Sequence, residues 1–334
     1  MKAQVYTQPN MLQLQDVPMP DSREGEVVLK IDAVGICGSD MHAWHGHDPR
    51  RKPGLVLGHE FSGTVVSSRA DGVAVGSRWT GNPLITCGVC EYCVQGRNNL
   101  CANRGMVGMT RAGAYAEYMS IPAASLIAMP QDMPATTAAL TEPAATAWHA
   151  LYLVQRALVR PVHECRALVI GGGAIGMLAA LLLRHLGAAQ IVVTETNALR
   201  RQSLHKAVAG CSTLDPREQD LPESHFDCVI DAVGGKATRQ QAFAAVKSGG
   251  VIMHIGLQDW SSEIDMRKLT LAEITLLGTY TYTTADLRAT VDALYRGAFG
   301  DLSWVLTRPL AQAQAVFEEL DQGRLSTAKV VLLP

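Results

Sequence analysis

The chain has 334 residues, of which 48% are hydrophobic and 18% charged, and its formal net charge is −2. This length exceeds what one hydrophobic core usually serves and predicts two domains. The near-neutral charge argues against nucleic-acid binding, and the N-terminal segment lacks the apolar core of a secretory signal. The sequence contains no apolar run of about 18 residues, the length that would predict a membrane-spanning helix. We therefore expect a cytoplasmic, enzyme-like protein.

The pattern of residues changes along the chain. Residues 1–145 are rich in Gly, Pro and short β-branched runs, which is typical of an irregular β domain. Residues 134–160 are Ala-rich and helix-like, and from Arg166 short apolar strands alternate with helices, six strands in all. Such alternation predicts a parallel sheet covered on both faces. After Thr284 helical patterns return, and the chain ends in the strand-like run AKVVLLP.

A glycine-rich motif, GGGAIG, follows the first of these strands and matches G-x-G-x-x-G. A strand before it and a helix after it are the context of a dinucleotide-binding site. Gly171 would make the tight turn, Gly173 would let the backbone approach a pyrophosphate, and Gly176 would let helix and strand pack closely. The residues expected to contact the cofactor here are Gly171, Gly173, Ala174, Ile175 and Gly176.

An acidic residue at the end of the next strand indicates which dinucleotide is bound. Glu195 lies 19 residues past Gly176 and would accept hydrogen bonds from the ribose hydroxyls. Its charge would repel a 2′-phosphate, so the sequence favours NAD over NADP. Arg200 and Arg201 leave the alternative open, since they could bind a phosphate; otherwise they form a solvated first turn of the next helix.

Four cysteines lie within fifteen residues and form the pattern C-x2-C-x2-C-x7-C. Four thiolates on short spacers predict a structural zinc site that leaves no position open to substrate. An iron–sulfur cluster is the alternative, but nothing else in the sequence indicates electron transfer. The four residues are Cys87, Cys90, Cys93 and Cys101.

A second set of metal ligands is scattered. Cys37, His59 and a carboxylate from Glu60 or Glu142 could supply sulfur, nitrogen and oxygen ligands. Three protein ligands and one open position are the arrangement of a catalytic zinc. Spacing alone does not assemble this site.

The order of the motifs resembles the zinc-dependent medium-chain dehydrogenases. GICGSDMH, LGHEFSG, the four-cysteine segment, AGAYAEY and VIGGGAIGM occur in the family's order, and the likeness spans essentially the whole chain. Within the superfamily the sequence resembles the polyol branch, which includes sorbitol, galactitol-phosphate and threonine dehydrogenases. The marker is Glu142 in TEPAATAWH, where alcohol dehydrogenases typically place a cysteine.

This resemblance implies roles for individual residues. Cys37 and His59 match the catalytic zinc ligands, and Glu60 and Glu142 match carboxylates that bind zinc directly or through water. Asp40 matches the carboxylate that orients the ligand histidine. The remaining matches are Ser39 and His42 for the proton relay, and Val233 and Ile255 beside the nicotinamide.

The fold implied is a GroES-like catalytic domain of residues 1–146 with 285–334, and a six-stranded Rossmann domain of residues 147–284. The activity implied is zinc- and NAD-dependent oxidation of a secondary alcohol on a polyol or sugar derivative, by a homo-oligomer (dimer or tetramer). Alternative substrates are a sugar acid, a sugar phosphate or a 3-hydroxy amino acid, with NADP possible. The polar segment after Trp44 (HGHDPRRKPG) is either a solvated loop or a source of cations for an acidic substrate.

Two rival functions fit less well. A zinc-free quinone reductase of the same superfamily would lack both sets of ligands, which are present here. A zinc ribbon that binds nucleic acid would need a basic surface, which a chain of net charge −2 does not suggest.

Overall fold

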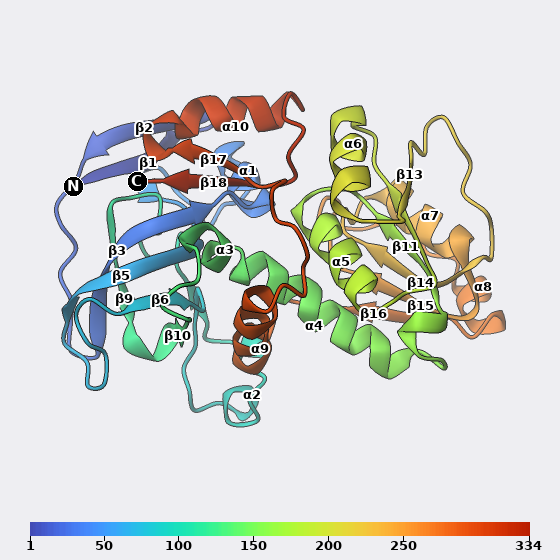
Figure 1. The fold of residues 1–334 in the computed structure, drawn as a ribbon, viewed down its shortest axis with the longest axis horizontal. Coiled ribbons are helices and arrows are strands. Elements are labelled where there is room, and N and C mark those ends of the chain that lie inside the picture. The colour runs from blue at the N-terminus through green and yellow to red at the C-terminus, as the bar shows by residue number, and fades with distance from the viewer.

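Two large sheets divide the chain into two lobes. The computed structural model describes residues 1–334, and Figure 1 shows the lobes side by side with helix α4 running between them. The helices are α1 (Gly38–Trp44), α2 (Glu91–Val94), α3 (Ala135–Ala139), α4 (Thr141–Ala157), α5 (Ala174–His185), α6 (Ala198–Ala207), α7 (Lys236–Ala245), α8 (Met266–Leu271), α9 (Thr284–Tyr295) and α10 (Ala313–Asp321), with short 3₁₀ turns η1 (Asn98–Leu100), η2 (Ala123–Ser125), η3 (Val162–Glu164) and η4 (Leu310–Gln312).

The strands of the first lobe include two from the C-terminus. They are β1 (Lys2–Gln8), β2 (Met11–Asp16), β3 (Glu26–Gly35), β4 (Leu55–Val56), β5 (Glu60–Ser68), β6 (Arg78–Gly81), β7 (Leu84–Ile85), β8 (Gly105–Met106), β9 (Tyr118–Pro122), β10 (Leu126–Ala128), β17 (Leu306–Pro309) and β18 (Val330–Leu333). The main sheet has the order β10-β6-β5-β3-β18-β17, with β9 also paired to β3. The chain therefore returns to its first sheet at its end.

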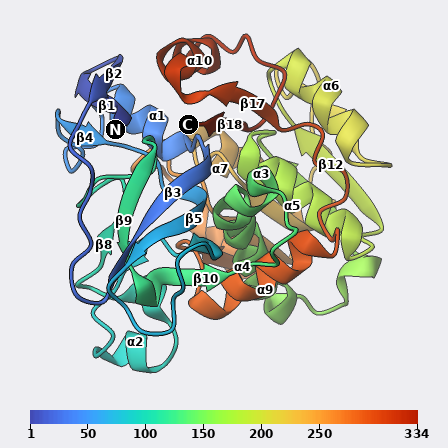
Figure 2. The ribbon, with the colours of Figure 1, turned by 60° about the vertical axis from the view of Figure 1, so that its left-hand side comes forward.

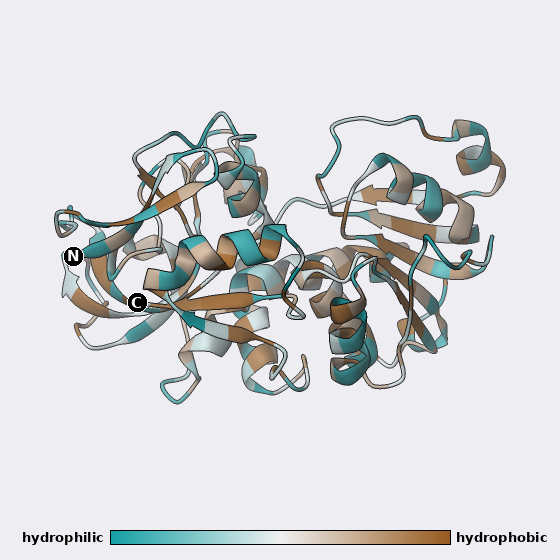
Figure 3. Cartoon of the chain, turned by 90° about the horizontal axis from the view of Figure 1, so that it is seen from above, coloured by the Kyte–Doolittle hydropathy of each residue, from teal (hydrophilic) through white to brown (hydrophobic).

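The second lobe is a six-stranded parallel sheet, as predicted. Its strands are β11 (Arg166–Ile170), β12 (Gln190–Thr194), β13 (Ser212–Leu214), β14 (Phe226–Asp231), β15 (Val246–His254) and β16 (Thr275–Gly278). Their order is β13-β12-β11-β14-β15-β16, and each neighbouring pair is parallel. Figure 3 shows apolar residues along these strands and polar residues on the outer helices. In such a sheet, ligands bind at the carboxyl ends of the strands, at the point where the strand order reverses. Here that point lies between β11 and β14.

Helix α4 connects the lobes and carries Glu142 in its first turn. Pro143 is tolerated there because the first turn has no intrahelical partner for its missing N–H. The helix contacts α5 in the second lobe and β5 and α9 on the other side, and Figure 2 shows α4 beside α5 and α9. This position brings Glu142 to the junction where the first lobe presents its own polar side chains.

Strand β17 was not foreseen from the sequence, and the predicted domain boundary falls inside a helix. Strand β17, with the sequence LTRP, has no apolar pattern and was not expected; it forms because it pairs with β18 along its whole length. The boundary between the two predicted domains at residue 146 falls inside α4, so the bounds remain a prediction. No helix in the structure is long and apolar enough to span a membrane.

Candidate active site

Helix α1 begins at the segment GICGSDMH and places Asp40 beneath Cys37. Cys37 is the N-cap of the helix, and its backbone N–H donates to Asp40 Oδ2 at 3.2 Å. The Tyr115 hydroxyl donates to the same oxygen at 2.7 Å. Asp40 is fully buried, so these donors compensate for its lost hydration.

His59 lies against the other oxygen of this carboxylate. Its Nδ1 is 3.4 Å from Asp40 Oδ1, which leaves Nε2 free to bind a metal. Burial alone would raise the pKa of Asp40, but His59, Arg51 and the Tyr115 hydroxyl outweigh burial and hold that pKa well below its usual range. Gly58, just before His59, has φ +90°, and a Cβ there would lie 2.4 Å from the Tyr115 ring. The motif LGHE therefore needs this glycine.

Glu60, the first residue of β5, is neutralised by a lysine from the far end of the chain. Lys329 Nζ donates to both carboxylate oxygens at 2.7 Å and to the Ile36 carbonyl at 2.7 Å. Both side chains are at most 2% exposed. Burial lowers the pKa of Lys329, but the Glu60 carboxylate and the other nearby acids outweigh it and keep that pKa raised.

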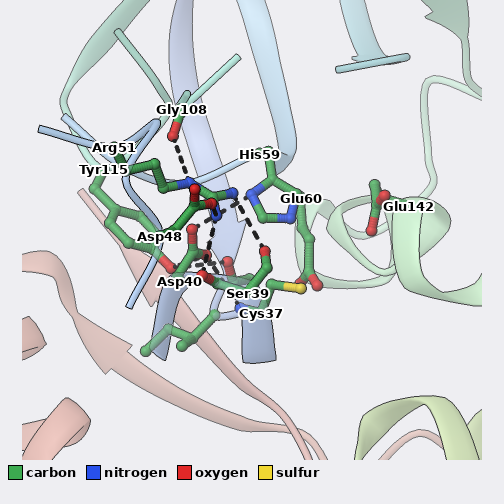
Figure 4. A network of polar contacts seen from close by, with 12 residues as sticks. Cys37, Ser39, Asp40, Asp48, Arg51, His59, Glu60, Gly108, Tyr115 and Glu142 are labelled. Carbon is green, nitrogen blue, oxygen red and sulfur yellow. Dashed lines mark hydrogen bonds and ion pairs between the residues drawn. The ribbon is translucent and has the colours of Figure 1, made fainter. Parts of the chain in front are cut away.

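Cys37, His59 and Glu60 form one candidate metal group. One ligand atom from each lies within 4.8 Å of the others, and Figure 4 shows the Cys37 sulfur beside the Glu60 carboxylate. Sulfur, nitrogen and oxygen donors at this spacing fit zinc. Glu142 is not in this group; its Oε1 accepts a hydrogen bond from the buried Tyr282 hydroxyl at 2.8 Å. Burial, with the nearby Glu60 charge, raises the pKa of Glu142 to about 6.

Arg51 lies beneath the expected proton relay. Its guanidinium is buried and donates to the Ser39 carbonyl at 3.1 Å, to Ser39 Oγ at 3.3 Å and to the Gly108 carbonyl at 3.0 Å. Asp48 neutralises it at 3.0 Å. Most of the segment after Trp44 is exposed, as expected of a solvated loop, but Arg51 is buried and paired with Asp48 inside the protein, so it is not available to a substrate. His42 is exposed, one helical turn after Ser39.

The glycine-rich turn lies at the carboxyl end of β11. Gly173 is the N-cap of α5, and a Cβ on Gly173 would meet nothing within 4 Å, so there is room beside the helix N-terminus. A Cβ on Gly176 would lie 1.8 Å from the Gly171 carbonyl oxygen. Open space before the exposed N–H groups of a helix fits a pyrophosphate.

Glu195 and Arg200 lie beside this turn. The Glu195 carboxylate accepts the N–H groups of Gly172 and Asn197 at 2.9 and 2.7 Å. Arg200 Nη1 is 4.0 Å from Glu195, and the buried Arg200 Nε has no partner. An unpaired buried donor next to the expected ribose position fits a ligand oxygen. Arg201 is unavailable for a phosphate, because it pairs with Asp215 at 2.9 Å.

Val233 and Ile255 follow β14 and β15 at the same edge of the sheet. A Cβ on Gly171 would lie 2.4 Å from the Val233 side chain, so Val233 borders the glycine turn. The structure thus gathers the expected cofactor residues at one edge.

The four cysteines of the 87–101 segment converge. Their sulfur atoms lie within 4.8 Å of one another, and Cys101 Sγ is 3.5 Å from Cys87 Sγ. This donor set fits one tetrahedral zinc and leaves no open position.

Comparison with known proteins identifies the family. The alcohol dehydrogenase GroES-like domain matches residues 23–131, and the zinc-binding dehydrogenase domain matches residues 174–296. An L-threonine 3-dehydrogenase of Chelativorans sp. is 31% identical over 325 residues, which is 93% of this chain and 92% of the relative. The chain belongs to the zinc-dependent medium-chain dehydrogenase superfamily.

Two solved structures of this superfamily resemble the chain over its whole length. A zinc-binding dehydrogenase from Sinorhizobium meliloti 1021, bound to NADP, has a TM-score of 0.89 and 29% identity, covering 100% of this chain and 99% of that one. Acetophenone reductase from Geotrichum candidum, in complex with NAD, has a TM-score of 0.88 and 30% identity, covering 100% and 97%. As a member of this superfamily, the protein is an oxidoreductase of the zinc-binding dehydrogenase type.

Three residues of the site escaped sequence reasoning. Lys329, Tyr282 and Arg51 carry no motif, and two of them act over separations of 269 and 140 residues. Tyr115 lies in AGAYAEY, a motif that marks the superfamily, so a signal for it was present in the sequence.

Proposed function

We propose that the protein catalyses the reversible, NAD-dependent oxidation of a secondary alcohol on a polyol or sugar derivative to the ketone. The observation that supports this most is the grouping of Cys37, His59 and Glu60 within 4.8 Å, in a chain of the zinc-binding dehydrogenase family. A mixed ligand set of three leaves a position for an alcohol, which the four-cysteine set does not.

Each residue of the group has a role in this proposal. When bound, zinc supplies a Lewis acid that lowers the pKa of a hydroxyl group, and the nicotinamide supplies the hydride acceptor. Cys37, His59 and Glu60 hold the metal, and Asp40 orients His59. Ser39 accepts the alcohol proton and passes it to His42 and the solvent, while the hydride leaves the carbon. The alcohol thus loses one hydride and one proton.

NAD is the proposed cofactor. The Glu195 carboxylate would lie at the ribose hydroxyls, and Arg201 is already paired with Asp215, so little positive charge is left for a 2′-phosphate. Arg200 could still donate a hydrogen bond from its unpaired Nε to a phosphate oxygen. Relatives have been solved with each cofactor, so the choice rests on these side chains.

A 3-hydroxy amino acid is the second candidate substrate. It is favoured by the L-threonine 3-dehydrogenase that matches 93% of the chain. Such a substrate needs a cation for its carboxylate, and the buried Arg51 cannot supply one because Asp48 and Ser39 occupy it. A polyol needs only hydrogen bonds, which is why we place it first.

A substrate screen tests these proposals together. Reduction of NAD⁺ and NADP⁺ is measured with polyols, sugar acids, sugar phosphates and L-threonine, using wild type, Cys37→Ser and the control Cys165→Ser. Cys165 is buried, and its sulfur already faces the Pro161 carbonyl at 3.4 Å, where a hydroxyl also fits. We expect turnover with NAD⁺ and a polyol, lost in Cys37→Ser and kept in the control. Turnover unchanged in Cys37→Ser would refute the proposed site.

We also propose that the protein acts in the cytoplasm as a homo-oligomer, a dimer or tetramer, and that residues 1–146 with 285–334 and residues 147–284 form its domains. Strand β16 supports the oligomer, because it is the edge of its sheet and carries the part-exposed Leu276 (39%) near the fully exposed Trp260. Light scattering of the purified protein tests it, and a monomer at all concentrations would exclude it.

A further inference from the structure

A second chain segment, residues 279–284, runs from the end of β16 into the first residue of α9 and lies between the four-cysteine segment and Glu142. Just before Cys101, η1 presents two asparagines to this segment. Asn99 Nδ2 donates to the Tyr280 carbonyl at 2.8 Å, and Asn98 Oδ1 accepts the Thr284 N–H at 3.1 Å. Asn99 is 3% exposed. The two hydrogen bonds therefore hold the segment on either side of Tyr282.

A third contact also holds the segment. The Arg104 guanidinium stacks on the Tyr280 ring, 4.5 Å from its centre, and donates to the Cys101 carbonyl at 2.7 Å. One arginine thus touches both the last cysteine of the four and the segment. The cysteine lobe, defined here as residues 87–104, is the structure against which the segment is held.

The backbone of the segment is strained where it is held. Thr281 has φ +47°, a left-handed conformation that a β-branched residue rarely adopts. The hydroxyls of Thr279 and Thr281 are buried without a hydrogen-bond partner. Such features persist only where surrounding contacts impose them, and they often occur at functional sites.

Tyr282, which lies between the two hydrogen-bonded positions, contacts Glu142. Tyr282 is fully buried, and its hydroxyl donates to Glu142 Oε1 at 2.8 Å. Glu142 Oε2 accepts no hydrogen bond, and Glu142 lies close enough to His59 and Glu60 for their charges to act on it. We propose that the cysteine lobe holds residues 279–284 so that Tyr282 fixes the Glu142 carboxylate, which makes Tyr282 a positioning residue for the catalytic metal. The inference rests on the metal site proposed at Cys37, His59 and Glu60.

Zinc release to a coloured chelator tests the inference without any substrate. The release phase that is missing from Cys37→Ser belongs to the catalytic site, and the remaining phase belongs to the cysteines. In Tyr282→Phe we expect the catalytic phase to be roughly tenfold or more faster, as is typical when the partner of a metal-site residue is lost. In Asn99→Ala, which acts one step further away, we expect a severalfold increase.

Matched controls separate positioning from a general loss of packing. Tyr295→Phe removes a hydroxyl that also bonds a carboxylate, Asp132 at 2.9 Å, but on an exposed face. Asn103→Ala removes an exposed asparagine of the same lobe. Both should release zinc at the wild-type rate. If Asn99→Ala does not fold, Asn98→Ala replaces it, because it removes the other hydrogen bond.

Three outcomes are decisive. Faster catalytic release in Tyr282→Phe and in the asparagine variant, with unchanged controls, supports the inference. Wild-type release in either of them overturns it while leaving the proposed function intact. If wild type shows no phase that Cys37→Ser lacks, the metal site itself is wrong, and the inference falls with it.

Discussion

Replacement of Lys329 by methionine tests whether Glu60 faces a metal. The change keeps a long, unbranched side chain but removes the cation that donates to both Glu60 oxygens at 2.7 Å. Glu60 is fully buried, so in the metal-free protein its charge would stand uncompensated. Breaking one partner of a buried ion pair costs about 3–5 kcal/mol. For a domain of about 150–250 residues, that lowers the melting temperature by roughly 6–20 °C.

Zinc should reverse part of this loss. A divalent cation at Cys37, His59 and Glu60 supplies the positive charge that Lys329 no longer does, so zinc should raise the melting temperature of Lys329→Met more than that of wild type. The four-cysteine site is the same in both proteins, and its contribution cancels in the difference between the two zinc effects. Scanning calorimetry of both proteins, with and without zinc, measures this difference.

A second background sharpens the test. In Glu60→Gln the buried charge is absent, so removing Lys329 should be much less harmful there than in wild type, and the two effects should not add. Equal zinc effects in wild type and Lys329→Met, or a loss of stability below about 1 kcal/mol in the metal-free variant, would show that Glu60 neither depends on Lys329 for its charge nor faces a metal.

Three further predictions concern other parts of the molecule. Arg51→Met should lower the free energy of unfolding by about 3 kcal/mol, because the buried Asp48 loses its inner partner, whereas Arg50→Met, whose side chain is 67% exposed, should cost at most about 1 kcal/mol; urea unfolding compares the two. Gly176→Ala should weaken NAD⁺ binding about tenfold or more in calorimetric titration, because the added Cβ would lie 1.8 Å from a carbonyl oxygen and force the turn to shift; unchanged affinity would contradict the placement of the cofactor. Burial raises the pKa of Asp227, but the Lys247 ammonium and the Arg166 N–H outweigh it and keep that pKa lowered. The ionised Asp227 therefore stabilises the fold above its unfolded pKa near 4, and this contribution is lost as the pH falls through the folded pKa. Between about pH 5 and pH 2, wild type should lose more stability than Asp227→Asn.

Features encoded in short stretches of sequence could be predicted. The four cysteines and the glycine-rich turn are local patterns, and alternation of apolar strands with helices gave the order of elements in the second lobe, including all six strands. The GroES-like first domain came from the resemblance to the superfamily and is confirmed by the match to residues 23–131.

Contacts between distant residues could not be predicted in the same way. Lys329 lies in the ordinary run AKVVLLP, and only the pairing of β18 with β3 brings it to Glu60. Tyr282 lies in the polar run TYTYTT, and its relation to Glu142 depends on how β16 ends beside α4. The burial of Arg51 was missed because RRK reads as a solvated cluster, whereas Asp48 compensates the charge of one of these residues inside the protein.

Zinc content and turnover, measured on the same preparations of wild type and Cys37→Ser, test the central claim most directly. We expect zinc at both ligand groups of wild type, and in Cys37→Ser the loss of the catalytic zinc alone, together with the loss of alcohol-dependent NAD⁺ reduction. Wild type without zinc, or a Cys37→Ser variant that keeps both its zinc and its turnover, would contradict a catalytic zinc at Cys37, His59 and Glu60.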